Sequence, residues 1–484
     1  MKKESFKYLE IARALETMIE QWRRGETAHR PPRAFPSIRQ TAREWSVSPN
    51  TVVQAYGVLE SQGLIRGVER SGWQLIPPGE GVRRLAVPGV SKALEPRGAE
   101  LSLLMENAMD AARSSAGIPL GIAAPGADLI PQSQLSGLLR RQTAREEAWG
   151  YDFAPGRRSL RAQIAQLMIR LGTGIPAEAG HILMTRGATE GLYLALSAVT
   201  SPGDLLLTES PCFSGYLVLA RQLGLRILPL PTHPETGLDP RGLEEPISRH
   251  SGHACLLVSP NYANPLGSLM PWEHRTRIAE LCRQGDIPVI ENDVAGLIRF
   301  EGPVTPSLSS LVSRGVYLSS FSKTVGPGLR LGWVHSTGQM FEAMTARSVA
   351  QSTGGSALMA LMMEDFLGSG GFYRHLYRLR REAQERRNTM IHALNRVLPR
   401  GSRITRPRGG LVLWIELPQG SDTMVLQRLA RDQGITIAPG AIFSAHGEYA
   451  SCIRLGYGAA SPGQIRRGVE ILGRLIHLQR EEPV

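Results

Sequence analysis

The feature that most constrains the fold is a regular alternation, from about residue 118 onward, of short apolar runs with stretches of helical period. Six runs have the length and composition of buried strands: 181–185, 205–209, 226–230, 255–260, 287–292 and 315–320. Strands that alternate with helices indicate an α/β domain with a mostly parallel central sheet. The functional side chains of such sheets gather where the strands end, at the carboxyl edge.

The clearest functional signal follows the last of these runs. In the stretch SSFSKTVGPGLR, Lys323 stands among hydroxyls and glycines, with Ser320 and Ser322 beside it and Arg330 after it. Hydroxyls and a guanidinium bind phosphate oxygens, and a lysine beside them is typical of a Schiff-base lysine at a phosphate cup. The loop therefore predicts a phosphorylated cofactor attached at Lys323.

Residues after other strand-like runs fit pyridoxal 5'-phosphate as that cofactor. A helix that begins at Ala188 and Thr189 would turn its N-terminal amides toward an anion, although a plain strand-to-helix turn has the same pattern. Asp293 is a carboxylate that can keep the pyridine nitrogen protonated, which makes the ring an electron sink. Asn264 can donate to the phenolate oxygen, and Phe213 offers a flat face for stacking.

The order and spacing of these pieces resemble the fold-type I aminotransferases from about 118 to 475, and GGLVLWIELP (409–418) belongs to the same pattern. The resemblance implies that Lys323 forms the Schiff base, that Asp293 pairs with the pyridine nitrogen and that Asn264 contacts the phenolate, while Phe213 stacks on the ring. It implies that the phosphate is held by Ala188, Thr189, Ser320, Ser322 and Arg330, and that Tyr151 reaches the phosphate from a partner subunit. Arg454, in CIRLGYG, would bind the carboxylate of a substrate or effector.

The first 77 residues carry a different pattern. Apolar residues recur at helical spacing over 8–22, and Ser37 and Ser48 are each placed to cap a further short helix. The last of these helices buries one apolar stripe and leaves Asn50, Thr51 and Gln54 on its other side, where small polar side chains can read a major groove. The apolar–charged–apolar stretch LIRGVERSGWQLIP predicts a two-stranded wing.

The stretch PSIRQTAREWSVSPNTVVQAYGVLESQGLI resembles the winged helix-turn-helix of the GntR family of bacterial repressors, and the resemblance covers nearly all of residues 5–77. It implies that DNA is contacted by these residues: Arg39, Ser48, Asn50, Thr51, Gln54, Arg66 and Arg70. Pro49 stands where the family often has arginine, and Glu69 makes the wing less basic than usual.

A GntR-type reader followed by an aminotransferase-like body resembles the MocR subfamily of bacterial transcription regulators over nearly the whole chain. We therefore expect a DNA-binding domain at 1–77, a linker and lead-in helix at 78–117, and a cofactor-binding domain at 118–484 with a smaller C-terminal α+β subdomain. The resemblance implies a head-to-tail homodimer that binds double-stranded promoter DNA and senses pyridoxal phosphate or an amino compound, with vitamin B6 or amino-acid metabolism as its target.

One motif departs from the relatives, which carry two acids and a following tyrosine where this chain has ENDVAGLIRF. Asn292 replaces the first acid, and Ala295 stands near the place of the tyrosine. Loss of that hydroxyl lowers the odds of efficient transamination and leaves ligand sensing intact. Two alternatives stay open: a working aminotransferase for a substrate such as aminoadipate or kynurenine, with an accessory DNA-binding module, and a DNA-binding protein with an empty scaffold.

Composition agrees with a nucleic-acid partner. The net charge is +12 over 484 residues, and the arginine-rich segment 378–408 is either a solvated helix and loop or a surface that touches DNA. The four scattered cysteines have no metal-ligand spacing and favour a reduced, cytoplasmic setting without a metal site. No apolar run is long enough to span a membrane, so we expect no membrane partner.

Overall fold

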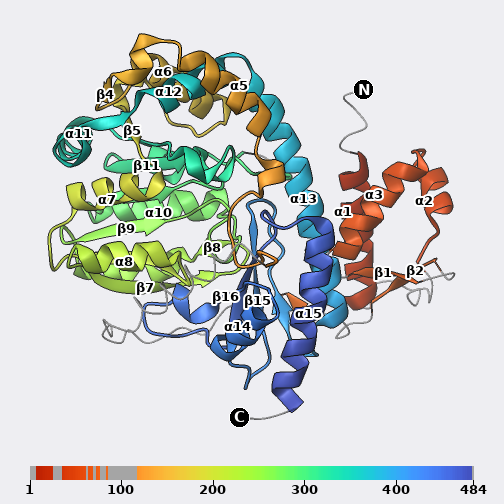
Figure 1. Cartoon of the computed structure of the whole chain (residues 1–484). Helices are drawn as coiled ribbons and strands as arrows, with labels where there is room; N and C mark the ends of the chain where they lie inside the picture. Colours follow the sequence, from red (N-terminus) through yellow and green to blue (C-terminus); the bar gives the residue numbers. More distant parts are fainter. Residues whose placement is uncertain are drawn as a thin grey trace.

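The computed structural model describes residues 7–24, 35–61, 64–68, 72–76, 83–84, 117–302 and 304–481, which form one large body and a smaller N-terminal module (Figure 1). Residues 85–116, which include most of the predicted linker and lead-in helix, lie outside the described residues. The large body contains an eight-stranded sheet and a five-stranded sheet.

The eight-stranded sheet carries all six of the predicted strands. Its strands are β5 (Ile182–Thr185), β6 (Leu205–Ser210), β7 (Arg226–His233), β8 (Gly237–Leu238), β9 (Ala254–Val258), β10 (Val289–Asn292), β11 (Gly315–Ser320) and β12 (Gly332–His335). In the order β5-β12-β11-β10-β9-β6-β7-β8, only β12 and β8 run against the rest. The carboxyl ends of the six predicted strands therefore meet at one edge.

Helices cover both faces of this sheet because neighbouring strand residues point to opposite sides. On one face, α7 (Ala188–Val199), α8 (Ser214–Gln222) and α11 (Gly338–Ser352) pack on Leu206 and Ile290. On the other face, α9 (Glu244–Arg249) and α10 (Trp272–Gln284) pack on Leu207 and Val289. A third layer at the β5 edge contains α5 (Gln132–Gln142), α6 (Arg158–Arg170), α12 (Ala357–Gly368) and the pair β4 (Tyr151–Phe153) and β13 (Gly354–Ser356).

The smaller sheet forms the C-terminal subdomain together with three helices. Its strands, in the order β16-β17-β15-β14-β3, are β16 (Ala438–Pro439), β17 (Cys452–Gly456), β15 (Val412–Glu416), β14 (Arg403–Ile404) and β3 (Arg83–Arg84). The helices are α13 (Gly371–Val397), α14 (Thr423–Asp432) and α15 (Pro462–Glu481). Part of the predicted linker thus joins this sheet, because β3 pairs in parallel with β14.

The N-terminal module has the predicted three helices and ribbon, α1 (Lys7–Arg24), α2 (Ile38–Glu44), α3 (Pro49–Ser61), β1 (Ile65–Val68) and β2 (Gly72–Leu75). The Oγ of Ser37 caps α2 by accepting from the backbone N–H of Gln40 at 3.2 Å. The Tyr56 ring is fully buried, and its hydroxyl donates to the carbonyl of Pro36 at 2.8 Å and pairs with Thr41 at 2.6 Å. This hydroxyl fixes α3 against the start of α2.

The N-terminal module packs on the long helix α13 through α1 and α3 (Figure 1). The carboxylate of Glu60 in α3 lies 3.8 Å from the His392 ring. Tyr8 in α1 approaches the side chain of Gln384, and burial followed by the Glu301 carboxylate raises the pKa of Tyr8. The N-terminal module therefore packs against the large body of the same chain.

Part of the arginine-rich segment 378–408 belongs to the core, which neither expectation for it anticipated. Arg386 is buried, donates to the carbonyls of Gly458 and Ala460 at 2.9 and 3.0 Å, and pairs with Asp128. Arg387 is also buried; its guanidinium donates to the carbonyl of Pro407 at 2.7 Å. These two arginines hold α13 against the loops of the large body.

Candidate functional site

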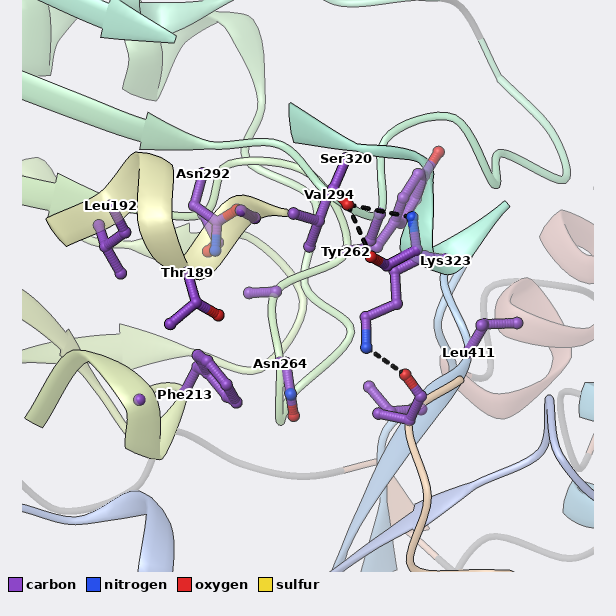
Figure 2. A pocket seen from close by; sticks show the side chains of 18 of the residues that line it. Thr189, Leu192, Phe213, Tyr262, Asn264, Asn292, Val294, Ser320, Lys323 and Leu411 are labelled. Carbon is purple, nitrogen blue, oxygen red and sulfur yellow. Dashed lines mark hydrogen bonds between the residues drawn. The ribbon is translucent and has the colours of Figure 1, made fainter. Parts of the chain in front are cut away.

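A cavity of about 210 Å³ lies at the carboxyl edge of the large sheet. Most of the predicted cofactor-binding residues line it: Ala188, Thr189, Phe213, Asn264, Ser320, Ser322, Lys323 and Arg330. They come from the ends of different strands, and Figure 2 shows Lys323 extending into the space that Thr189, Phe213 and Asn264 also face. The structure thus brings these eight residues together.

Lys323 sits in the short turn Phe321–Lys323 directly after β11. Its Nζ donates to the carbonyl of Ala123 at 2.6 Å. Burial, with a smaller contribution from the charge of Arg454, lowers the pKa of Lys323 to about 8. A lysine with this pKa has a substantial neutral fraction near pH 8, and the neutral amine is the nucleophile that attacks a carbonyl group.

One end of the cavity is built for an anion. Gly187 precedes α7 with a φ of +92°, and a Cβ there would come within 3.0 Å of the Arg330 guanidinium. Arg330 itself has a left-handed φ of +51° and donates to the carbonyl of Arg186 at 2.8 Å. A guanidinium therefore lies at the N-terminal end of α7, where the amides of Ala188 and Thr189 begin the helix.

Asp293 is not placed as predicted. It lines a second cavity; its Oδ1 accepts from the Asn261 amide at 2.9 Å and its Oδ2 accepts from the Tyr317 hydroxyl at 2.8 Å. A Cβ at Gly296 would come within 2.1 Å of Oδ1, so the glycine leaves room for this orientation. Burial and the neighbouring Glu291 raise the pKa of Asp293 to about 7.

Asn292 takes the place in the Lys323 cavity that was predicted for Asp293. A shift of one residue at a strand end turns a side chain to the opposite face, which is why the sequence assignment failed. The amide nitrogen of Asn292 donates to the Tyr216 hydroxyl at 2.5 Å, and its Oδ1 is buried without a hydrogen-bond partner. Among the described residues that line the cavity there is no Asp and no Glu.

Arg454 lies on β17, beside the cavity but not among the described residues that line it. Its Nη1 donates to the Oδ1 of Asn264 at 3.4 Å, its Nη2 donates to the carbonyl of Gly121, and its Nε is buried without a partner. Burial lowers the pKa of Arg454 to about 10. No described carboxylate forms an ion pair with it, so its charge remains available to an acidic ligand.

Tyr151 lines neither the Lys323 cavity nor the second cavity of its own chain. Its side chain on β4 is 82% exposed and stacks on Phe153 at 5.4 Å between ring centroids. Trp149, at 73% exposure, precedes it. With Phe153, at 63% exposure, they place three exposed aromatic side chains within residues 149–153.

The predicted DNA contacts lie at the surface of the N-terminal module where the structure describes them. Arg39, Ser48, Asn50, Gln54 and Arg66 are exposed, and Thr51 is half-buried. Ser48 and Thr51 are engaged with each other, since their hydroxyls lie 2.8 Å apart and Ser48 caps α3. Arg70 lies outside the described residues.

Sequence reasoning missed a polar network at the back of the cavity. The Tyr216 hydroxyl lies 2.7 Å from the Oγ of Ser259, in addition to its bond from Asn292. Asn261 and Tyr262 line the cavity as well. Two signals point to these residues: Tyr216 is three positions after Phe213 on α8, and SPNYANPLG concentrates polar side chains after β9.

Comparison with known proteins agrees with this architecture. Residues 136–472 match the family of class I and II aminotransferases. The HTH-type transcriptional regulator YjiR of Escherichia coli (strain K12) is 32% identical over 98% of this chain and 100% of its own length. The chain belongs to the MocR/GntR-type regulators that carry an aminotransferase domain.

Other relatives share one or both parts of this regulator. The probable rhizopine catabolism regulatory protein MocR of Rhizobium meliloti is 27% identical over 90% of this chain and 88% of its own. The α-aminoadipate aminotransferase LysN of Thermus thermophilus, solved with N-(5'-phosphopyridoxyl)-L-leucine, is 27% identical with a TM-score of 0.72, covering 78% of this chain and 95% of that one. Within the part of the regulator that the structure describes, no helix is long and apolar enough to cross a membrane.

Proposed function

We propose that this regulator reads operator DNA through α2, α3 and the β1–β2 wing, and that pyridoxal 5'-phosphate in the Lys323 cavity serves to sense a ligand rather than to sustain turnover. The observation that carries the proposal is the composition of the cavity. Its described lining has a buried lysine and an anion-binding end, yet no carboxylate.

The residues present fit the phosphate and the aldehyde of the cofactor. Arg330, the amides at the start of α7, and the hydroxyls of Ser320 and Ser322 would hold the phosphate. Lys323 would attach the cofactor, and Phe213 would cover one face of its ring. When bound, pyridoxal phosphate supplies an aldehyde that condenses with amines and a ring that can accept electron density. Asn264 and Arg454 would then meet the phenolate and an effector carboxylate.

The residues present do not fit the catalytic use of the ring. An acid beside the pyridine nitrogen keeps it protonated, and only the protonated ring is a strong electron sink. The neutral amide of Asn292 cannot supply that charge, and Ala295 supplies no hydroxyl. These two positions favour a sensor over the competing aminoadipate- or kynurenine-type transaminase.

The remaining parts of the proposal concern assembly and partners. The boundaries 1–77, 78–117 and 118–484 separate DNA reading, connection and ligand sensing. A second copy in head-to-tail orientation would cover the exposed aromatic side chains of Trp149, Tyr151 and Phe153, with Tyr151 reaching toward the phosphate of the partner subunit. The setting is the cytoplasm, and genes of vitamin B6 or amino-acid metabolism are the targets. The effector is pyridoxal phosphate itself or an amino compound that displaces Lys323.

A gel-shift titration tests the DNA-reading half of the proposal. The probe is DNA from upstream of the protein's own gene and the adjacent divergent gene, with unrelated DNA as competitor at one fixed salt concentration, because phosphate contacts depend steeply on salt. We expect a specific complex that Gln54→Ala weakens and that Arg428→Gln, an exposed arginine on α14, leaves unchanged. Equal affinity for both DNAs would contradict the proposal.

A further inference from the structure

A second cavity, of about 300 Å³, lies behind the first. Asn261 and Tyr262 line both cavities and form the wall between them. The other walls come from the end of α6, the segment 293–307 that follows β10, and α13. None of the residues expected to hold the cofactor lines it, apart from the reassigned Asp293.

Three arginines, against one carboxylate (Asp293) among the described lining residues, give this cavity a net positive charge: Arg170, Arg299 and Arg380. The guanidinium of Arg299 forms no hydrogen bond and no ion pair with any described residue. Arg380 uses its Nε to donate to the carbonyl of Leu297 at 2.8 Å, and Arg170 lies over the ring of Tyr373 at 5.3 Å. Burial and then the charge of Arg299 lower the pKa of Arg380 to about 10, which indicates that the two guanidinium groups repel each other.

The carboxylates near the cavity do not neutralise these arginines. Asp293 is bound to Asn261 and Tyr317 and forms no ion pair with them. Glu301 acts on the pKa of Tyr262 and of Tyr8 but forms no ion pair within the described residues. Arg299 and Arg380 are half-buried, and apart from the Nε of Arg380 their guanidinium groups have no described acceptor. Burying such N–H groups unpaired is costly, and an anion that accepts several of them removes that cost.

The rest of the lining selects the kind of anion. Apolar and aromatic side chains make up much of the wall: Leu171, Tyr262, Leu297, Val304, Tyr373 and Leu376. Inorganic phosphate would leave these surfaces without contact, whereas an organic acid can set its carboxylate between Arg299 and Arg380 and lay its carbon skeleton on them. We propose that this cavity is a binding site for a small organic acid, a carboxylate with an apolar or aromatic body.

The location of the cavity gives such a ligand a route to the DNA-reading module. Arg380 lies on α13, which carries the N-terminal module, and Arg299 is two residues from Glu301, which acts on Tyr8. A carboxylate that draws Arg299 and Arg380 together would therefore act close to the contact between α13 and the N-terminal module. This regulatory consequence rests on the proposed function, while the binding itself does not.

Fluorine NMR of para-fluorobenzoate with the full-length, pyridoxal-phosphate-loaded protein tests the site. We expect saturable line broadening for para-fluorobenzoate and none for the neutral para-fluorobenzyl alcohol. Arg299→Gln removes a guanidinium that forms no hydrogen bond or ion pair with the described residues, and it should weaken binding about tenfold, the effect of one charged hydrogen bond. Arg428→Gln should change nothing.

The Lys323→Ala variant decides which cavity the acid occupies. Binding retained in Lys323→Ala and weakened in Arg299→Gln supports the second cavity. Binding lost in Lys323→Ala and unchanged in Arg299→Gln would place the acid in the first cavity and overturn the proposal, as would the absence of saturable binding to the wild type. Neither result depends on DNA, so a failure here is distinct from a failure of the proposed regulator function.

Discussion

Replacing Asn292 with Asp should restore the charge that the cofactor ring lacks in this chain. The two side chains have nearly the same shape, and the Tyr216 hydroxyl that now accepts from the Asn292 amide can rotate to donate to a carboxylate. A carboxylate at about 3 Å from a protonated ring nitrogen contributes about 5 kcal/mol of attraction at an effective dielectric constant of about 20. That attraction alone would raise the pKa of the ring nitrogen by about 4.

Burial of the new carboxylate offsets part of this gain, as the raised pKa of the neighbouring Asp293 illustrates. If about 1.5–3 kcal/mol survives in the transition state of proton removal from an amino-acid donor, the half-reaction accelerates about 10- to 100-fold. Single-turnover absorbance measurements with loaded protein and an amino donor would record this rate. A pH titration of the cofactor absorbance would record the ring pKa independently of any turnover.

Asp293→Asn is the matched control, because it neutralises the adjacent carboxylate in the other cavity. We expect this control to change the half-reaction rate far less than Asn292→Asp does. The reasoning is refuted if Asn292→Asp leaves both the rate and the cofactor titration unchanged. It is equally refuted if Asp293→Asn abolishes cofactor binding, because Asp293 would then face the ring as first predicted.

Three further predictions follow from single groups. The rate at which the cofactor attaches to Lys323 should increase as pH rises through about 8 and level off above that pH, because the lowered pKa of Lys323 makes the neutral amine available there. Stopped-flow absorbance measures this rate, and a pH profile centred near 10 would contradict the prediction. Arg330→Gln should weaken the binding of pyridoxal phosphate at least about tenfold and have little effect on the binding of pyridoxal, which has no phosphate. Equilibrium dialysis measures both affinities, and an equal loss of affinity for the two compounds would contradict the assignment of Arg330 to the phosphate. Tyr56→Phe should lower the stability of the N-terminal module by about 1–3 kcal/mol, because it leaves the Pro36 carbonyl and the Thr41 hydroxyl without their buried partner. Calorimetry of the full chain should show the first unfolding transition at a lower temperature, and an unchanged first transition would contradict the prediction.

Much of the fold could be predicted from the sequence because its signals are local. Most of the predicted strands are short apolar runs buried on both faces, as in β5, β6, β9 and β10, and Ser37 caps its helix through a residue three positions away. Lys323 and Arg330 were found for the same reason, because a strand end and a short loop fix both of them. Strand β12 was missed, since four residues directly after the Lys323 loop show no separate pattern.

The parts that could not be predicted depend on contacts between residues far apart in the sequence, or on which of two adjacent residues at a strand end points into the cavity. Asn292 and Asp293 are adjacent polar residues, and only the geometry at the end of β10 decides which of them lines the Lys323 cavity. Arg170, Arg299 and Arg380 are more than 80 residues apart in sequence and share a cavity only because the fold brings the end of α6, the segment after β10 and α13 together there. Likewise, no local pattern marks Glu60 as a partner of His392.

The central claim is that the Lys323 cavity controls DNA binding by its ligand state, and one comparison tests it most directly. Fluorescence anisotropy would measure the affinity for promoter DNA, at one fixed salt concentration, of the wild-type protein without cofactor, with pyridoxal phosphate, and with pyridoxal phosphate plus candidate amines. Lys323→Ala would be measured under the same conditions. We predict that cofactor or amine changes the affinity or footprint of the wild type and that Lys323→Ala abolishes the change. Specific DNA binding that ignores every ligand state of the wild type, or a response that persists unchanged in Lys323→Ala, would contradict the account.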